Sequence, residues 1–321
     1  MLGCIGGRRI VQFSAESSQA RYVYSYQQIQ VLAGRRYVAE RPLHTFEVVS
    51  ATRFAPHMVR VVLGGEGFDT FTPSDFTDSY VKFVFLHPDV DVTNLPEPLH
   101  LSSFSSLPPQ HQPTVRTFTV RRADSEARQL TVDFVIHGEQ GVAGPWARTA
   151  RPGDVIRLMG PGGAYRPKAA ADWHLFAGDE AGLPAISAAL EALAPGAVGK
   201  AFIEIGSPED EIELVKPEGV ELTWVHRGGR ADLVGDDRAG DNAPLIAAVT
   251  GTRWLTGQVQ VFIHGEAQAV MHNLRPYIRK ERGVDASWTS ISGYWRRGRT
   301  EDTFRQWKKA LAVAESAANE G

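Results

Sequence analysis

The hydrophobic period of the chain changes near Pro167, and this change most constrains the fold. Upstream of it, six short runs have the residue types of strands and are separated by turns rich in Gly, Pro and Asp: HTFEVVSATRF, HMVRVVLGG, SYVKFVFL, VRTFTVRRAD, QLTVDFVIHG and GDVIRLMGP. In the fifth run, apolar residues at 130, 132, 134 and 136 alternate with more polar neighbours, as in a half-buried strand. Six strands without a long helix predict a small antiparallel barrel over residues 42–168, with the Pro-rich segment 87–113 as a long loop within it.

Downstream of Pro167, strands alternate with helices. The strand-like runs are WHLFAG, KAFIEIG, VELTWVHR and QVQVFIHG. Two helical patterns accompany them: LPAISAALEAL, with apolar residues 183, 186, 190 and 193 on one stripe, and the segment from Ala267 to Arg282, with Val270, Leu274 and Ile278 on its inner face. This alternation predicts a parallel-sheet α/β domain over residues 169–299, with both faces of the sheet covered.

Two segments lie outside these predicted domains. Residues 1–41 have little periodicity, and we expect them to form an extension outside the folded domains. Residues 300–321 begin with Thr300, carry Asp302 in the first turn, and then place Phe304, Trp307 and Leu311 at helical spacing. These features predict an amphipathic C-terminal helix.

Composition narrows the chemistry that the chain can perform. A net charge of −3 gives no general attraction to nucleic acid or to an anionic membrane surface, so we expect neither as a partner. The single cysteine, Cys4, cannot form an internal disulfide or supply the thiolates of a zinc or iron–sulfur site. Histidine clusters with metal-binding spacing, HExxH and CxxC are absent from the sequence, so we expect no resident metal. Redox chemistry would then need an organic cofactor, or a metal that arrives with the substrate.

The sequence also gives an expectation for location. No apolar run approaches the roughly 20 residues needed to cross a bilayer. The first residues lack the basic start, apolar middle and cleavage site of a signal peptide. We therefore expect a cytoplasmic protein.

The strand VRTFTV places an arginine, an aromatic ring and a hydroxyl group within four residues. A flavin cofactor needs a flat apolar surface, hydrogen bonds to its ring edge and cations for its phosphates. Phe118, Thr119 and Arg116 can supply these, the arginine as a charge-assisted donor. Strand alternation places Arg116 and Phe118 on one face and Thr119 on the other, unless a bulge redirects the hydroxyl. The alternative interpretation is a strand with solvated arginines and a core phenylalanine.

A glycine-rich turn follows the next strand, in VIHGEQGVAGPWA. A helix that begins in such a turn presents free backbone N–H groups and the positive end of its dipole, which suit a pyrophosphate. His137 ends the strand and can reach the ribityl chain or the ring of a flavin. Its alternative role is that of a structural histidine.

Together these segments resemble the flavin-containing siderophore-interacting proteins, or ferric-siderophore reductases, a branch of the ferredoxin-reductase-like flavoenzymes. The family's Arg-x-Tyr-Thr motif is similar to residues 116–119, and its His-Gly…Gly-Pro…Trp-Ala segment to residues 137–147. Three further matches follow in order: ARPGDVIRLMGPGGAY, GDEAGLPAI, and Gly-Tyr-Trp-Arg-x-Gly at 293–298. Phe118 replaces the usual Tyr, and Ala181 and Gly182 replace Thr-Ala. The resemblance covers about residues 42–300 and involves five separated motifs in the family's order.

The resemblance implies a cofactor, FAD, and a reaction. Proteins of this family take electrons from NADH, NADPH or a reduced carrier such as ferredoxin, and pass them through FAD to the iron of a ferric siderophore. Hard oxygen donors hold ferric iron far more tightly than ferrous iron, so reduction releases the metal. No side chain needs to act as an acid or a base, and a chain with one cysteine cannot belong to the iron–sulfur branch of such reductases. The residues implied to hold FAD are Arg116, Phe118, Thr119, His137, Gly138, Gly144, Pro145, Trp146, Ala147, Asp179, Glu180 and Trp295.

A nicotinamide donor would bind at the carboxyl edge of the sheet, where Gly178, Arg227 and Glu266 end or follow strands. The chain lacks GxGxxG, so this domain would not grip a pyrophosphate as a dehydrogenase does. Arg227 can meet an adenosine phosphate, which would favour NADPH; the alternative is an exposed arginine at a strand end. Because siderophores are often anionic, we expect a basic patch at the mouth of the cleft, and the candidate contacts are Lys82, Arg279, Lys280 and Arg297.

Two other functions remain open from the sequence. One is a different flavin oxidoreductase of the same layout that serves a ferredoxin, a free flavin or a quinone. The other is a non-enzymatic protein that binds a ferric siderophore without reducing it.

Overall fold

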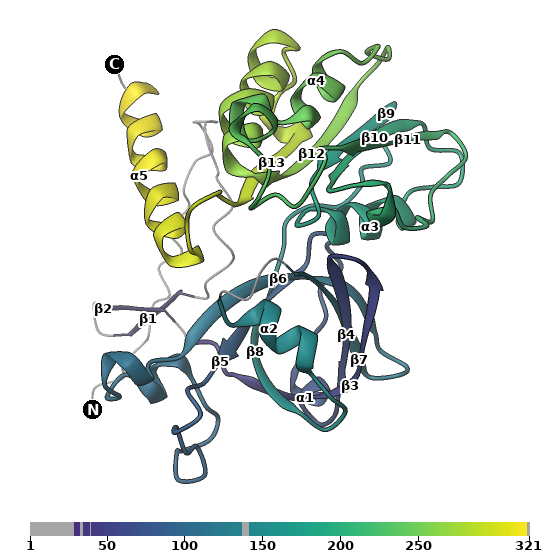
Figure 1. Cartoon of the computed structure of the whole chain (residues 1–321). Helices are drawn as coiled ribbons and strands as arrows, with labels where there is room; N and C mark the ends of the chain where they lie inside the picture. Colours follow the sequence, from purple (N-terminus) through teal and green to yellow (C-terminus); the bar gives the residue numbers. More distant parts are fainter. Residues whose placement is uncertain (1–28, 33–34, 39, 137–140, 320–321) are drawn as a thin grey trace, which may run out of the picture.

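The computed structural model describes residues 29–32, 35–38, 40–136 and 141–319 (Figure 1). The first described elements are two short strands, β1 (Ile29–Leu32) and β2 (Arg35–Val38), which form a separate antiparallel pair. Within the described part of the chain, no helix combines the length and apolarity that crossing a bilayer requires.

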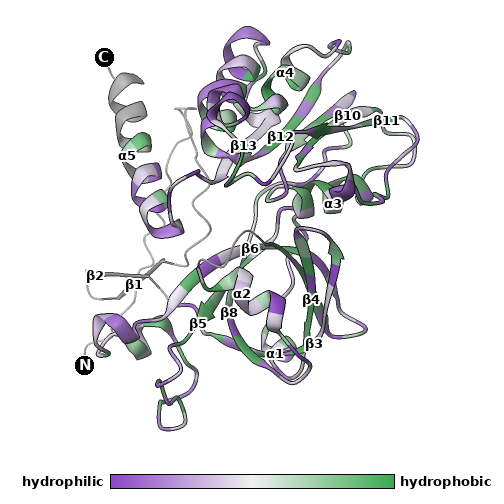
Figure 2. Ribbon diagram, viewed as in Figure 1, coloured by the Kyte–Doolittle hydropathy of each residue, from purple (hydrophilic) through white to green (hydrophobic). Residues whose placement is uncertain are grey.

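Six strands close into an antiparallel barrel, which confirms the prediction for the first domain. They are β3 (His44–Ala55), β4 (Met58–Gly64), β5 (Tyr80–Phe85), β6 (Thr114–Asp124), β7 (Gln129–Val135) and β8 (Val155–Gly162), in the order β3-β4-β7-β6-β5-β8. The apolar residues that alternate along β7 point inward: Leu130, Val132 and Phe134 are fully buried. Two short helices accompany the barrel, α1 (Gly67–Thr70) and α2 (Ala143–Thr149). Figure 2 shows hydrophobic residues along the barrel strands and the central strands of the second sheet.

The second domain is a parallel sheet in the order β11-β10-β9-β12-β13. Its strands are β9 (Trp173–Gly178), β10 (Gly199–Ile205), β11 (Val220–His226), β12 (Val259–Glu266) and β13 (Thr289–Trp295). Covering helices are α3 (Leu183–Glu191), α4 (Pro244–Thr250) and two π-helical segments, Gln268–Leu274 and Tyr277–Glu281. Short 3₁₀ turns occur at Leu101–Phe104, Pro109–His111, Pro208–Asp210, Asp236–Arg238, Gly240–Asn242 and Ala286–Trp288. Strand β13, which carries the Gly-Tyr-Trp motif, was not among the predicted strands.

The strand order creates a switch point between β9 and β12, because the chain continues from β9 to one side and from β12 to the other. Ligands of open parallel sheets bind outside the carboxyl ends of strands at such a point. Gly178 ends β9 there, and a β-carbon at this position would lie 2.4 Å from the carbonyl oxygen of His264 on β12. Glycine thus permits the two central strands to end side by side.

The two domains are joined through several contacts near this edge. His57 of the barrel hydrogen-bonds Asp210 of the sheet domain at 2.7 Å, and Tyr165 packs on Phe262 with ring centroids 4.5 Å apart. The C-terminal helix α5 (Glu301–Asn319) starts close to β6 of the barrel and runs away from it (Figure 1).

Candidate functional site

The β6 segment places an aromatic wall on the barrel. The Phe118 ring is half-buried and lies 4.3 Å from that of Phe134 and 5.4 Å from that of Phe83, centroid to centroid. Trp146 of α2 continues the cluster, 5.6 Å from Phe134. Phe118 is therefore packed against the barrel core but remains partly exposed, so a ring system can contact it.

Thr119 is buried, and its hydroxyl forms a hydrogen bond with the side chain of Tyr294 on β13. The contact ties the barrel strand to the last strand of the sheet. The Gly-Tyr-Trp motif thus contributes directly to the junction between the domains.

Arg116 already has an anionic neighbour. Its Nη1 donates to Asp302 Oδ2 at 3.4 Å and to the carbonyl oxygen of Val115 at 2.8 Å. One position along, the backbone N–H and the hydroxyl of Thr117 donate to the carboxylate of Glu301 at 3.1 and 2.8 Å. The first turn of α5 therefore presents two carboxylates to the strand where we expected phosphate binding. The arginine is half-buried and paired, so it is not the solvated arginine of the alternative interpretation.

The glycine-rich turn continues into α2, whose first residues include Gly144, Pro145, Trp146 and Ala147. A β-carbon built on Gly144 or on Gly141 would meet no atom within 4 Å, so the backbone here faces open space. Ala147 is fully buried and anchors the helix on the barrel. His137 and Gly138 lie outside the described residues.

These features fit FAD. The partly open Phe118 wall can take the isoalloxazine ring, and the open backbone of α2 together with Arg116 can take the diphosphate. Two carboxylates of α5 oppose an anionic group here, Glu301 beside Thr117 and Asp302 paired with Arg116. Because the pair of Arg116 with Asp302 is long and its carboxylate is 62% exposed, it is a weak competitor.

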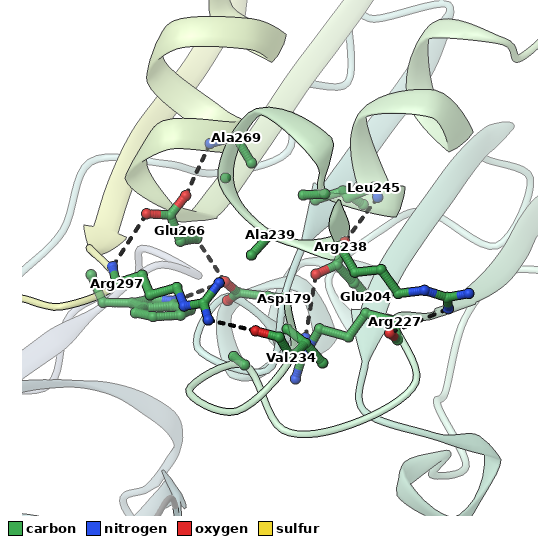
Figure 3. A pocket seen from close by; sticks show the side chains of 14 residues that line it. Asp179, Glu204, Arg227, Val234, Arg238, Ala239, Leu245, Glu266, Ala269 and Arg297 are labelled. Atoms are coloured by element: carbon green, nitrogen blue, oxygen red, sulfur yellow. Dashed lines mark hydrogen bonds and ion pairs between the residues drawn. The ribbon is translucent and has the colours of Figure 1, made fainter. Parts of the chain in front are cut away.

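A network of buried carboxylates lies at the carboxyl ends of β9, β10 and β12 (Figure 3). Asp179 accepts hydrogen bonds from the backbone N–H groups of Ala181 and Glu266 and, at 2.7 Å, from the indole of Trp295. Burial raises the pKa of Asp179. Trp295 therefore uses its polar edge within the protein, which leaves only its ring for an expected cofactor contact.

Arg227 is the cation of this network. It is 3% exposed, forms an ion pair with Glu180, and places Nη1 3.4 Å from Glu204. Its Nε donates to the carbonyl oxygen of Gly229. The alternative of an exposed arginine at a strand end is therefore wrong, and the guanidinium proposed for an adenosine phosphate is already engaged by carboxylates.

The buried carboxylates predict a dependence of stability on pH. Burial raises the pKa of Glu204 from 4.5 to about 7, and it also raises the pKa of Glu180. Between pH 4.5 and about pH 7, Glu204 is protonated more often in the folded state than in the unfolded state. The free energy of unfolding therefore falls as the pH rises through this range. We expect the free energy of unfolding to decrease from pH 5 to pH 8, with Glu204 contributing up to about 3 kcal/mol.

Urea denaturation across this range measures the effect. In a Glu204→Gln variant the decrease should be smaller, because the substituted side chain does not ionise. An equally steep decrease in the variant and the parent would contradict the assignment to Glu204.

A hollow of about 610 Å³ opens beside the network. Its lining includes Asp241, Glu266, Arg296 and Arg297. Glu266 accepts from the backbone N–H groups of Gln268 and Ala269, so it caps the following helix, and burial raises its pKa. The two arginines lie beside three acidic residues of the same lining, Asp236, Asp241 and Glu266, and Arg297 forms an ion pair with Asp236.

The four proposed siderophore contacts are not brought together. Lys82 pairs with Thr117 across β5 and β6, and Arg297 lies at the carboxyl edge of the sheet. Arg279 donates to Thr289, the first residue of β13, so it and neighbouring Lys280 lie toward the amino edge. The four side chains therefore do not form the expected basic patch.

The sequence did not predict one cluster of possible metal ligands. His87, Asp89 and His111 each offer a ligand atom, and these atoms lie within 4.8 Å of one another. The sequence signal was weak, because a His-Pro-Asp triplet and a distant histidine have no standard metal-binding spacing. The closed β5–β6 pairing brings them together.

Comparison with known proteins agrees with the two-domain arrangement. Residues 47–165 match the siderophore-interacting FAD-binding domain, and residues 171–298 match the siderophore-interacting protein domain. The chain is 68% identical to the uncharacterized protein Rv2895c of Mycobacterium tuberculosis, over 88% of this chain and 100% of the relative. It is 30% identical to the ferric vibriobactin reductase ViuB of Vibrio cholerae, over 78% of this chain and 88% of the relative.

Two further relatives extend the comparison. An NADPH-dependent ferric-chelate reductase of Escherichia coli is 30% identical, over 67% of this chain and 81% of that protein. The crystal structure of a siderophore utilization protein from T. fusca superposes with a TM-score of 0.67 at 37% identity, and covers 83% of this chain and 98% of that one. The chain therefore belongs to the siderophore-interacting protein family, and its barrel is the family's FAD-binding domain.

Proposed function

We propose that this protein is a FAD-dependent reductase that transfers electrons from NADPH, NADH or a reduced carrier to ferric siderophores, with release of ferrous iron. The observation that carries the proposal is the partly open Phe118 wall beside the open backbone of α2, next to the switch point of the sheet. The similarity to ferric vibriobactin reductase and to a ferric-chelate reductase supports the choice of acceptor.

In this proposal the residues of the protein bind and orient FAD. Phe118 supports one face of the ring system, and Arg116 and the α2 backbone hold the diphosphate. Bound FAD supplies the step between a two-electron nicotinamide donor and one-electron reduction of iron. Ferrous iron is then held weakly by the hard oxygen donors of the chelate.

The donor is proposed to enter the hollow at the carboxyl edge, which Arg296 and Arg297 line. Arg297 would then exchange its ion pair with the exposed Asp236 for a phosphate of the donor. Arg227 is assigned a structural role instead, because it neutralises buried carboxylates. The name of the NADPH-dependent relative favours NADPH over NADH. Since reduced nicotinamides are supplied inside the cell, we place the reaction in the cytoplasm.

An anaerobic assay tests the proposal. Purified protein reconstituted with FAD is mixed with a ferric siderophore and a ferrous-specific chelator, and NADPH, NADH or reduced ferredoxin is added in separate reactions. We expect formation of the ferrous complex with at least one donor, and none with the FAD-free protein. Absence of the ferrous signal with every donor would contradict the reductase function, and a shift in siderophore binding without reduction would favour a carrier. Turnover of free flavin or a quinone without any reduction of siderophore would favour another flavin oxidoreductase.

A further inference from the structure

The long connection between β5 and β6 brings three metal-binding residue types together. His87 and Asp89 lie just after β5, and His111 ends the 3₁₀ turn that precedes β6. The two strands are antiparallel, with Phe85 opposite Thr114, so the two ends of the connection lie side by side. The barrel itself therefore fixes the distance between the histidines, although they are far apart in the sequence.

We propose that His87, Asp89 and His111 form a binding site for a divalent first-row transition-metal ion. Two imidazoles and one carboxylate are a donor set that suits ions such as Zn²⁺ and Fe²⁺. The site lies in the barrel loop, apart from the Phe118 wall and the carboxyl edge of the sheet. It goes beyond the proposed electron transfer, which needs no resident metal.

The geometry is close to that of a bound ion. His87 Nδ1 lies 3.5 Å from Asp89 Oδ2. Two ligand atoms on one tetrahedral zinc ion are about 3.4 Å apart, given bonds of about 2.1 Å. All the ligand atoms lie within 4.8 Å of one another, so the side chains must approach by up to about 1.4 Å to reach tetrahedral spacing.

The histidine rings must also turn, because an imidazole nitrogen binds a metal in the plane of its ring. The His87 and His111 rings are stacked, with centroids 4.5 Å apart and planes 25° apart. The Nδ1 atom of His87 accepts a 3.3 Å hydrogen bond from the backbone N–H of Asp89, which a metal bond would replace. Both histidines are half-buried and Asp89 is exposed, so water or a small ligand can complete the coordination.

Titration of untagged, full-length protein with Zn²⁺ by calorimetry tests the site. We expect one equivalent to bind at pH 7.5, and affinity to fall by at least about tenfold in His87→Ala and in His111→Ala. Asp91→Asn is the matched control, since this exposed carboxylate lies in the same loop and accepts its hydrogen bonds, within the part of the chain that the structure describes, from Thr93.

Two outcomes would overturn the site. One is the absence of Zn²⁺ binding by the parent protein, and the other is an unchanged isotherm in the His87→Ala/His111→Ala double variant. Circular dichroism confirms that a variant is folded, and His111→Gln serves as a second variant that keeps a polar side chain. The ferrous-trap assay is independent of this result, so failure of the metal site and failure of the reductase function are distinguishable.

Discussion

Replacing Arg227 with methionine is expected to destabilise the folded protein by about 3–5 kcal/mol at pH 8, because the change leaves buried carboxylates without their cation. Glu180 and Glu204 both contact this guanidinium, and Asp179 lies near enough to interact with it electrostatically. Burial already raises the pKa of all three carboxyl groups in the intact network. Loss of the arginine should raise them further.

The sign of the pH effect follows from these shifts. At pH 5 the buried carboxylates of the folded variant can bind protons and become neutral. Part of the stability that is lost at pH 8 therefore returns. Chemical denaturation at pH 5 and pH 8, followed by circular dichroism, measures the difference. Arg238→Met is the matched control: this exposed arginine lines the same pocket, and among the described residues it donates a hydrogen bond only to the carbonyl oxygen of Arg227, so we expect a loss of less than about 1 kcal/mol. A similar loss in both variants, or the same loss at both pH values, would contradict the proposed role of Arg227.

FAD affinity is expected to fall by about tenfold to a hundredfold in Arg116→Ala, since a charge-assisted hydrogen bond to a phosphate is lost. Removing the competing charge should have the opposite effect. In Asp302→Asn the arginine loses its partner on α5, and we expect FAD to bind up to about fivefold more tightly. Fluorescence quenching of FAD on titration with FAD-free protein measures both changes.

The control for this pair lies on the same strand. Arg122 is 69% exposed and pairs with Asp124, away from the α5 contact, so Arg122→Ala should leave FAD affinity unchanged. If Asp302→Asn weakens FAD binding instead, then the first turn of α5 helps to hold the cofactor and does not compete with it. If Arg116→Ala has no effect, the diphosphate does not lie at this strand.

Much of the architecture was predictable from local patterns. The alternation of apolar residues along β7 and the apolar stripe of α3 each predict that one face of the element is buried. The structure confirms both predictions, since Leu130, Phe134, Ile186 and Leu190 are fully buried. The family motifs likewise indicated the two matched domains. Strand β13 was missed because its residues, TSISGYW, include glycine and serines and are only half-buried along most of their length.

The sequence by itself determined the barrel, the parallel sheet and the C-terminal helix, because the period of apolar residues is a local property of the chain. Only the tertiary structure decided which charges meet. The pairing of Arg227 with Glu180 and Glu204 joins the ends of three strands, and the cluster of His87, Asp89 and His111 depends on closure of the β5–β6 hairpin. The contact of Arg116 with Asp302 joins residues 186 positions apart in the sequence. Such partners are separated by tens to hundreds of residues, and their distances are set by strand order and helix docking, which the hydrophobic period does not encode.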